Sequence, residues 1–481
     1  MNDANLTLHT DKYQINMMYA HWKRGSMNEK AVFEAYFRKL PFGNGFAVFA
    51  GLERIVAYIR SLAFNDEEIE YLRMQEEKYD EDFLLELRKF KFTGNLFAMR
   101  EGTLVFPNEP LVRVEARVFE AQLIETAMLN FMNYQTLIAT KAARIKQVAT
   151  NERLLEFGTR RAQEADAAVW GARATYIAGF HATSNMRAGM LFGIPSSGTH
   201  AHSWVQGHDS EEEAFKEYAE ALPDHVTLLV DTYDTLRSGV PNAIKIAKEL
   251  EQRGKRLKGI RLDSGDLAYL SKRARSMLDE AGFTDALIVA SNDLDEDIIA
   301  ELKAQGARID VWGVGTQLIT AFDQPSLGGV YKLVAREKNG ILEPVIKISG
   351  NPEKISNPGV KEVYRVVNRQ TGMAVADYMC LPEEEEEIRK GQPIKLSDPL
   401  HPHRSILVEN YEAIALLQPI FDKGELVYEL PKLDEARSFH QDQLGHFWPE
   451  HLRKLNPEMY RVYFSRSILE LKTELLNKYQ G

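Results

Sequence analysis

Short apolar runs alternate with amphipathic segments between about residues 154 and 334. The runs lie at residues 155–157, 227–230, 259–262, 287–290 and 311–314. Helical spacing of apolar residues between them predicts helices over 163–176, 241–253, 267–281 and 293–305. Strand–helix alternation of this kind is typical of parallel βα units. A series of this length favours a (β/α) barrel over an open sheet, so the predicted fold class is α/β.

The first 150 residues have a different, mixed pattern. Residues 31–49 are rich in Phe, Tyr and Val around a Pro-Phe-Gly-Asn-Gly break, which predicts two strands around a turn. Residues 66–91 carry charges at helical spacing and predict one or two surface helices. Residues 103–118 predict a strand pair that turns at Pro107 and Asn108. This part is expected to be α+β.

After about residue 335 the βα pattern ends in a Gly/Asn/Pro-rich stretch at 350–359. Strands follow, and a long C-terminal helix is expected over 457–479, with Val462, Ile468, Leu469, Leu471 and Leu475 as its buried stripe. The acidic run 383–387 predicts a solvated helix start or loop. We therefore expect an N-terminal α+β domain (1–150), a catalytic (β/α) barrel (151–334), and a segment (335–481) that packs on the N-terminal domain and ends in a helical region.

Composition narrows the class of protein. The 481 residues include 59 Lys and Arg against 70 Asp and Glu, for a net charge of −11. This balance argues against non-specific binding to nucleic acid or anionic membranes. The single cysteine, Cys380, excludes an internal disulfide and a Cys-rich zinc site, and favours the reducing cytoplasm. No signal peptide and no apolar stretch of about 18 residues is apparent.

Polar residues collect where the predicted strands end. These stretches are 158–161, 183–185, 198–202, 231–234, 261–266, 291–293 and 313–316. In a parallel barrel the carboxyl ends of the strands meet at one mouth, where catalytic groups lie. Arg160, Arg161 and Arg261 suit a carboxylate or phosphate. The Gly-Val-Gly-Thr stretch at 313–316 exposes backbone N–H groups suited to a phosphate, or forms a tight turn.

Four aspartates in these stretches have two interpretations. Asp231, Asp234, Asp263 and Asp266 could hold Mg²⁺, sugar hydroxyls or a histidine, although an Asp after a strand is more often a helix cap. Cationic, glycine-rich and acidic elements together indicate a phosphorylated sugar and a magnesium ion.

His200 and His202 leave three alternatives open. In a strand both side chains would face the same way and could ligate one metal, as in a metal-dependent hydrolase. Alternatively one histidine is buried and hydrogen-bonded and the other is on the surface. The third interpretation is a nucleophilic or acid–base histidine in an acidic, phosphate-binding mouth.

At these residues the sequence resembles the nicotinate phosphoribosyltransferase family, of the type II phosphoribosyltransferase class. The matching stretches are 10–14, 157–160, 183–185, 198–203, 231–234, 261–266 and 313–316, with 461–467 in the tail, there expected to be helical. The resemblance implies an irregular (β/α) barrel with an α+β domain built from the N-terminal and post-barrel segments.

The resemblance also implies a reaction. The family joins nicotinate to phosphoribosyl pyrophosphate, giving nicotinate mononucleotide and pyrophosphate in NAD synthesis, and couples this to ATP hydrolysis through a phosphorylated histidine. His202 matches that histidine, although His200 stands where an apolar residue is common. Mg²⁺ and ATP are the expected cofactors, and a cytoplasmic homodimer with shared active sites is the expected form.

Individual roles follow by the same matching. The expected catalytic residues are His202, Asp263 and Arg261, and the expected nicotinate-binding residues are Tyr13, Phe157, Ser184, Thr199 and Arg261, with Tyr13 reaching from a partner subunit. The phosphoribosyl and phosphate groups are expected at Arg160, Ser291, Asn292, Gly313, Gly315, Thr316 and Lys347. Lys332 and Lys354 are weaker candidates for the polyphosphate, or are simply solvated, and no residue is assigned to a dedicated metal site.

Ser184 bears on the choice of substrate. The related nicotinamide-using enzyme has an acidic residue near this position, which would repel the carboxylate of nicotinate, whereas a hydroxyl can donate to it. The acid is therefore favoured over the amide. The alternatives from other classes are a metal hydrolase that uses His200 and His202, and a non-enzymatic binding protein or scaffold.

Overall fold

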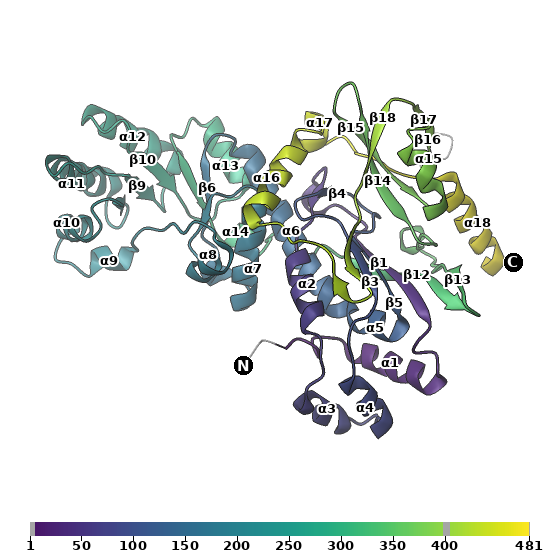
Figure 1. Ribbon diagram of the computed structural model, residues 1–481. Helices are drawn as coiled ribbons and strands as arrows, with labels where there is room; N and C mark the ends of the chain where they lie inside the picture. Colours follow the sequence, from purple (N-terminus) through teal and green to yellow (C-terminus); the bar gives the residue numbers. More distant parts are fainter. Residues whose placement is uncertain (1–4, 398–404, 481) are drawn as a thin grey trace. The chain divides into compact units, whose positions relative to one another are not determined.

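The computed structural model describes residues 5–397 and 405–480 (Figure 1). The chain forms two compact units, which we name the βα unit (Ile138–Pro325) and the sheet unit (Met1–Leu137 with Ser326–Gly481). In the described part of the chain, no helix combines the length and apolar character needed to cross a membrane.

The βα unit contains a six-stranded sheet in which every paired strand is parallel. Its strands are β6 (Arg153–Glu156), β7 (Ala182–Thr183), β8 (Thr227–Leu229), β9 (Gly259–Leu262), β10 (Leu287–Ala290) and β11 (Val311–Val314), in the order β7-β6-β11-β10-β9-β8. The predicted βα series is confirmed. The strand ladder ends at β7 on one side and at β8 on the other, so the core is barrel-like and its ring of strands is not continuous in the described chain.

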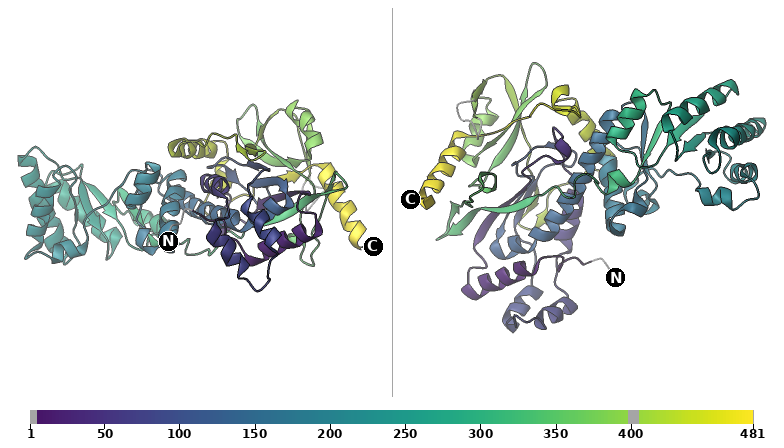
Figure 2. Two further views of the ribbon diagram at one scale, coloured as in Figure 1. Left: turned by 60° about the horizontal axis from the view of Figure 1, so that its bottom comes forward. Right: turned by 180° about the vertical axis from the view of Figure 1, so that it is seen from behind.

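Helices alternate with these strands and cover them. They are α7 (Glu164–Ile177), α8 (Met186–Phe192), α9 (His202–Gln206), α10 (Glu211–Ala221), α11 (Val240–Gln252), α12 (Leu267–Glu280), α13 (Glu296–Ala304) and α14 (Thr316–Ile319). Figure 1 shows α10, α11 and α12 side by side along β9 and β10, and Figure 2 gives the view from behind. Strand residues such as Ile260 and Ile288 are fully buried, as expected for parallel strands covered on both faces.

The sheet unit contains one larger antiparallel sheet, one larger mixed sheet and a short pair of strands. The first sheet has the order β13-β12-β1-β5-β3-β19-β20, the second β17-β16-β21-β15-β14-β18, and the pair is β2-β4. The strands are β1 (Lys30–Tyr36), β2 (Ala47–Val48), β3 (Asn95–Ala98), β4 (Leu104–Val105), β5 (Val112–Arg117), β12 (Val330–Lys338), β13 (Ile341–Pro344), β14 (Glu362–Asn368), β15 (Ala374–Cys380), β16 (Ile394–Ser397), β17 (Ser405–Val408), β18 (Tyr411–Ala415), β19 (Gln418–Asp422), β20 (Glu425–Leu426) and β21 (Val462–Phe464).

The helices of this unit flank the sheets. They are α1 (Lys12–Arg24), α2 (Leu52–Ser61), α3 (Asp66–Arg73), α4 (Glu81–Arg88), α5 (Val118–Leu123), α15 (Glu385–Arg389), α16 (Leu433–Leu444), α17 (Pro449–Leu452) and α18 (Arg466–Gln480), and α6 (Glu125–Val148) begins here and ends in the βα unit. The predicted helices over 66–91 are confirmed as α3 and α4, and the acidic run forms the start of α15. Strand β1 precedes the βα series and pairs with β12, which follows it. The segments before and after the βα unit therefore form one sheet.

Two local predictions need correction. The two strands predicted around a turn at 31–49 form as β1 and β2, but the strands expected to pair locally at 103–118 do not: β4 pairs with β2, and β5 pairs with β1 and β3. The C-terminal helix begins at Arg466 rather than at 457, because residues 462–464 form β21, which runs parallel to β15. Val, Tyr and Phe fit a half-buried strand better than a helix interior, so this tertiary pairing overrides the helical spacing.

His440 of α16 is a fully buried histidine in the sheet unit. Its Nδ1 lies 3.0 Å from the backbone oxygen of Gly102, to which the neutral ring donates. Gly102 has φ +91°, and a Cβ there would lie 2.8 Å from the oxygen of Ala436, so the turn and α16 fit closely. Burial lowers the pKa of His440 to about 4.

This buried ring predicts a loss of stability in mild acid. The unfolded chain takes up a proton at a pKa of about 6.5, whereas the folded chain does so only near 4, so the contribution of His440 is complete above pH 6.5 and decreases as the pH falls toward 4. The full decrease is about 3 kcal/mol. Urea midpoints measured from pH 7.5 to 4.5 should fall less steeply for His440→Asn, which keeps a donor and cannot titrate. Parallel pH profiles for the two proteins would exclude His440 as the source.

Candidate active site

A cavity of about 140 Å³ opens at the carboxyl ends of β6, β9, β10 and β11. Its lining is Phe157, Arg160, Arg161, Arg261, Asp263, Ser291, Asn292, Asp293, Gly313, Gly315 and Thr316. Nine of these are residues that the sequence singled out for substrate binding or catalysis. The other two are Arg161, which was expected to suit a carboxylate or phosphate, and Asp293, which belongs to the polar stretch 291–293 expected at the mouth.

Arg261 connects several parts of this cavity. Its Nε donates to Ser291 Oγ at 2.8 Å, Nη1 to Thr199 Oγ1 at 3.1 Å, and Nη2 to Asp263 Oδ1 at 2.8 Å. The guanidinium carbon lies 5.6 Å from the centroid of the Phe157 ring. The planar fork of Arg therefore fixes three acceptors from three segments, while an aromatic ring lies beside the cation.

Asp263 is the acceptor that both Arg261 and Ser291 contact. Ser291 Oγ donates a short hydrogen bond to Asp263 Oδ1, and the backbone N–H of Asp263 donates to Asp231 Oδ2 at 2.8 Å. Burial alone would raise the pKa of Asp263, but the Ser291 hydrogen bond and the charge of Arg261 outweigh it, so the pKa is lowered. Asp263 is thus held as a carboxylate.

His202 begins α9 beside this carboxylate. Its Nε2 lies 3.8 Å from Asp263 Oδ2, and its Nδ1 lies 3.1 Å from Thr232 Oγ1. The side chain is 39% exposed, so the ring is accessible to a ligand. Thr232 follows β8 in the Asp-Thr-Tyr-Asp stretch, and its contact with His202 could not be read from the sequence.

Phe157 and Gly313 fit together at the bottom of the cavity. A Cβ at Gly313 would lie 2.5 Å from the Phe157 ring, so glycine is required for the ring to pack there. Gly315 lies against the Phe157 backbone, where a Cβ would lie 3.2 Å from its oxygen. The glycines predicted as a phosphate loop therefore also seat the aromatic ring.

Arg160 and Arg161 contribute uncompensated positive charge. Both side chains are exposed, and within residues 5–397 and 405–480 neither guanidinium forms an ion pair. Asn292, on the same rim, has φ +114°, a backbone conformation that is costly for a residue with a Cβ. Free cations and a strained turn at one rim suit recognition of an anionic group.

Ser184 lies at the end of β7 and is exposed, outside the lining of this cavity. Its backbone N–H donates to the oxygen of Glu156 at 2.9 Å. The Glu156 carboxyl group, fully buried, accepts hydrogen bonds from Thr183 Oγ1 at 2.5 Å and from the backbone N–H of Gly158. This carboxyl group, which sequence analysis missed, ties the turn after β6 to the end of β7.

The structure separates the four aspartates into two kinds. Asp234 accepts from the backbone N–H groups of Leu236 and Arg237, and Asp266 caps α12 through the N–H of Tyr269. Asp231 instead accepts from Asp263 N and from Ser264 Oγ. Asp234 and Asp266 are therefore helix caps, and Asp231 and Asp263 belong to the site.

Asp231 and Asp263 are the residues that fit a magnesium ion. Asp231 Oδ1 is buried and has no hydrogen-bond partner among the described residues, and Asp263 Oδ2 faces His202 at 3.8 Å. Mg²⁺ is usually held by one or two carboxylates together with substrate phosphates. Among the described residues no group of three His, Cys, Asp or Glu side chains could hold a metal by itself.

His200 is not placed to serve as the second ligand of a two-histidine metal site. His200 is buried, and its Nε2 accepts the backbone N–H of Leu229 at 3.1 Å, while its Nδ1 lies 3.3 Å from the oxygen of Ala201. Both ring nitrogens are therefore engaged away from His202. Of the alternatives for this pair, the geometry favours a structural His200 and a chemical role for His202.

The remaining predicted residues lie in the sheet unit. Tyr13 is 50% exposed on α1, and Lys347 is exposed. Lys354 is also exposed, whereas Lys332 is half-buried and its Nζ donates to the backbone oxygen of Tyr331.

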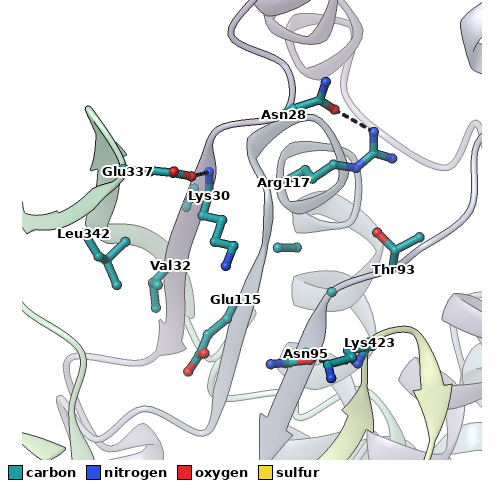
Figure 3. A pocket seen from close by; sticks show the side chains of 14 residues that line it. Asn28, Lys30, Val32, Thr93, Asn95, Glu115, Arg117, Glu337, Leu342 and Lys423 are labelled. Carbon is teal, nitrogen blue, oxygen red and sulfur yellow. Dashed lines mark hydrogen bonds between the residues drawn. The ribbon is translucent and has the colours of Figure 1, made fainter.

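A second cavity, of about 500 Å³, lies on one face of the seven-stranded sheet (Figure 3). Figure 3 shows Lys30, Glu115 and Arg117 around it, from β1 and β5. Arg117 donates to Asn28 Oδ1 at 3.0 Å, and the backbone N–H of Lys30 donates to Glu337 at 2.9 Å. No histidine or other residue that the sequence singled out for chemistry lines this cavity, so the smaller cavity is the candidate active site.

A cationic mouth with a held carboxylate and an accessible histidine, at the carboxyl ends of parallel strands, defines an enzyme site for phosphorylated substrates. Family models cover most of the chain: the nicotinate phosphoribosyltransferase N-terminal domain matches residues 8–133, the nicotinate phosphoribosyltransferase family residues 153–371, and the C-terminal domain residues 360–472.

Known proteins agree with these models. The chain is 55% identical to nicotinate phosphoribosyltransferase of Bacillus subtilis, over 99% of this chain and 96% of the relative. The crystal structure of the human enzyme superposes with a TM-score of 0.86 at 31% identity, covering 97% of this chain and 99% of that one. A nicotinate-nucleotide pyrophosphorylase from Pyrococcus furiosus shares the fold, with a TM-score of 0.70 at 23% identity. The chain belongs to the nicotinate phosphoribosyltransferase family of enzymes.

Arg261 gives a direct test of the site. Arg261→Lys keeps the charge but cannot reach Thr199, Asp263 and Ser291 together, so kcat/KM for nicotinate mononucleotide formation should fall about 100- to 1000-fold. The thermal midpoint should stay within a few degrees, because Arg261 is a partly exposed residue of the mouth. Arg256→Lys, a matched change at a surface ion pair, should leave activity unchanged. A kcat/KM within threefold of wild type for Arg261→Lys would contradict this role.

Proposed function

We propose that this enzyme joins nicotinate to phosphoribosyl pyrophosphate, giving nicotinate mononucleotide and pyrophosphate, and couples the reaction to ATP hydrolysis through phosphorylation of His202. The observation that carries the proposal is the Arg261 network, which holds the Asp263 carboxylate next to His202 and a cation beside the Phe157 ring. Membership of the nicotinate phosphoribosyltransferase family supports the overall reaction.

The pyridine ring of nicotinate would pack on Phe157. The guanidinium of Arg261 and the hydroxyl of Thr199, 3.1 Å apart, would then face its carboxylate. Ser184 would complete this side as a neutral donor at the end of β7. The ring nitrogen would point toward the sugar, whose anomeric carbon it attacks.

The phosphoribosyl group would occupy the rest of the cavity. Arg160, Ser291 and Asn292, together with Gly313, Gly315 and Thr316, would contact its hydroxyl and phosphate groups, a role supported by their shared cavity. By the family resemblance, Lys347 would bind the polyphosphate, and Lys332 and Lys354 are weaker candidates for the same role. Free cations are needed here because the leaving pyrophosphate carries several negative charges.

In the transfer step, the bond from the sugar C1 to the pyrophosphate oxygen breaks while a bond from the pyridine nitrogen to C1 forms. Positive charge develops on the sugar, and negative charge on the leaving oxygen. The lowered pKa of Asp263 keeps it ionised, so it can stabilise the positive charge, and Arg160 can stabilise the negative charge. Mg²⁺ held by Asp231 and Asp263 would supply charge neutralisation on the phosphates.

His202 would serve as the phosphoryl acceptor. If Nδ1–H donates to Thr232 Oγ1, the Nε2 lone pair is free to attack the γ-phosphorus of ATP. The new bond joins Nε2 to phosphorus, the bond from phosphorus to the β,γ-bridging oxygen breaks, and ADP leaves. Water later cleaves the N–P bond and releases phosphate. ATP can drive the transfer only if the phosphorylated enzyme binds one side of the reaction better.

Tyr13 is half-exposed on α1, which suits a residue donated to the active site of a second subunit in a homodimer. The single cysteine, Cys380, is buried and unpaired, and such a thiol needs no oxidising compartment. We propose a cytoplasmic homodimer on these grounds.

Substrate choice is tested by steady-state product formation with phosphoribosyl pyrophosphate, Mg²⁺ and ATP. Nicotinate should be used better than nicotinamide or quinolinate, and Ser184→Asp should raise KM for nicotinate about tenfold or more by repulsion of its carboxylate. Ser184→Thr, which keeps the hydroxyl, is the control. Better use of nicotinamide or quinolinate by the wild-type enzyme would refute the proposed substrate.

The phosphohistidine is tested by labelling with [γ-³²P]ATP. The protein should acquire a base-stable, acid-labile label that His202→Ala lacks, and this variant should lose stimulation by ATP. His208→Ala is the matched control, because His208 lies on the same segment but is engaged by Trp204 and Glu217. A label that persists in His202→Ala would assign phosphorylation to another residue.

A further inference from the structure

Strand β8 is the last strand of its sheet, and within the described part of the chain one side of its backbone has no strand partner. The N–H of Val230 donates to the oxygen of Arg261 on β9, so the preceding N–H, that of Leu229, faces the open side. Leu229 is buried, and a buried backbone N–H without an acceptor is costly. Its acceptor is the Nε2 of His200, at 3.1 Å.

His200 is built to accept this hydrogen bond. The side chain is buried, its Nδ1 lies 3.3 Å from the oxygen of Ala201, and the ring packs edge-on against Tyr218 at 4.8 Å between centroids. A ring that accepts at Nε2 is neutral and carries its proton at Nδ1. Burial lowers the pKa of His200, which agrees with a neutral ring.

Residues 195–197, shortly before His200, also pair with β7, the strand at the other end of the sheet. The N–H of Thr183 on β7 donates to the oxygen of Pro195 at 3.0 Å, and the N–H of Ser197 donates to the oxygen of Thr183 at 2.9 Å. Residues 195–200 therefore connect β7 to β8. At β7 the connection consists of backbone hydrogen bonds. At β8 the imidazole of His200 accepts the backbone N–H that a carbonyl of a neighbouring strand would otherwise accept.

This connection lies next to the proposed phosphoryl acceptor. His202 follows His200 by two residues, and Thr232, whose Oγ1 lies 3.1 Å from His202 Nδ1, follows Leu229 by three. The hydrogen bond between His200 and Leu229 thus links the segment that carries His202 to the segment that carries Thr232. Loss of the bond would leave the spacing between His202 and Thr232 unfixed.

We propose that His200 is a positioning residue that closes the open edge of β8 and thereby fixes His202 for phosphoryl transfer from ATP. The proposal rests on the proposed role of His202. It extends that role, because His200 touches neither substrate nor reacting atoms and acts through the position of its neighbour.

The test compares the ratio of ATP-stimulated to ATP-independent nicotinate mononucleotide formation in matched variants. His200→Leu removes the acceptor, and the ratio and the level of phosphorylated enzyme should fall about tenfold or more, with ATP-independent activity within twofold of wild type. His200→Gln can place an amide oxygen near the Nε2 position and should restore most of the ratio. His200→Asn is too short to reach Leu229 and should behave like His200→Leu, so it replaces that variant if His200→Leu does not fold.

His181→Leu is the control for loss of stability alone. His181 also accepts a backbone N–H, that of Leu154 at 3.0 Å, but at the amino end of the strands, away from the mouth. It should leave the ratio unchanged. An equal loss of the ratio in His181→Leu and His200→Leu would overturn the proposal. It would also be overturned if His202→Ala loses ATP stimulation while His200→Leu or His200→Asn keeps the wild-type ratio. Full ATP stimulation in His202→Ala would instead refute the proposed function on which this inference rests.

Discussion

The candidate site depends on the three hydrogen bonds of Arg261. The guanidinium on β9 binds Thr199 from the segment before α9, Asp263 just after β9, and Ser291 after β10. Because these acceptors come from different segments, one side chain determines their relative positions. A lysine could neutralise Asp263 but could not hold a planar arrangement of acceptors. The ionisation of Asp263 depends on the hydrogen bond from Ser291 and on the charge of this side chain, which also contacts Ser291.

Much of the site could be predicted from the sequence because parallel strands place all their carboxyl ends at one mouth. Polar stretches such as 198–202 and 261–266 are far apart in the chain, and the alternating pattern alone brings them together. The pattern does not distinguish residues of the same type that have different roles. Asp231 and Asp234 share one stretch, yet one binds the Asp263 backbone and the other caps a helix turn. That difference depends on where each carboxylate meets a backbone N–H in three dimensions.

The parts that could not be predicted are long-range pairings. Strand β1 joins β12, about 300 residues later, and residues 462–464 leave a helical pattern to pair with β15. Local spacing carries no information about such partners, because the stabilisation comes from cross-strand contacts and burial rather than from propensity. His200 is a similar case. A histidine on an apolar position is ambiguous in sequence, and its function as a backbone acceptor becomes visible only beside the open edge of β8.

An acidic chain can still bind an anionic group, because the charge that a ligand meets is local. Exposed glutamates such as Glu383 and Glu386 contribute to the net charge of −11 on the outer surface of the sheet unit. Charges at a protein surface are screened over about 8 Å at physiological salt, so the residues that line a cavity dominate its local charge. Within the cavity, Arg261 is already balanced by Asp263, whereas Arg160 and Arg161 have no partners there. These two arginines therefore supply the local positive charge that an anionic substrate meets, and the net charge of the chain is a poor guide to what it binds.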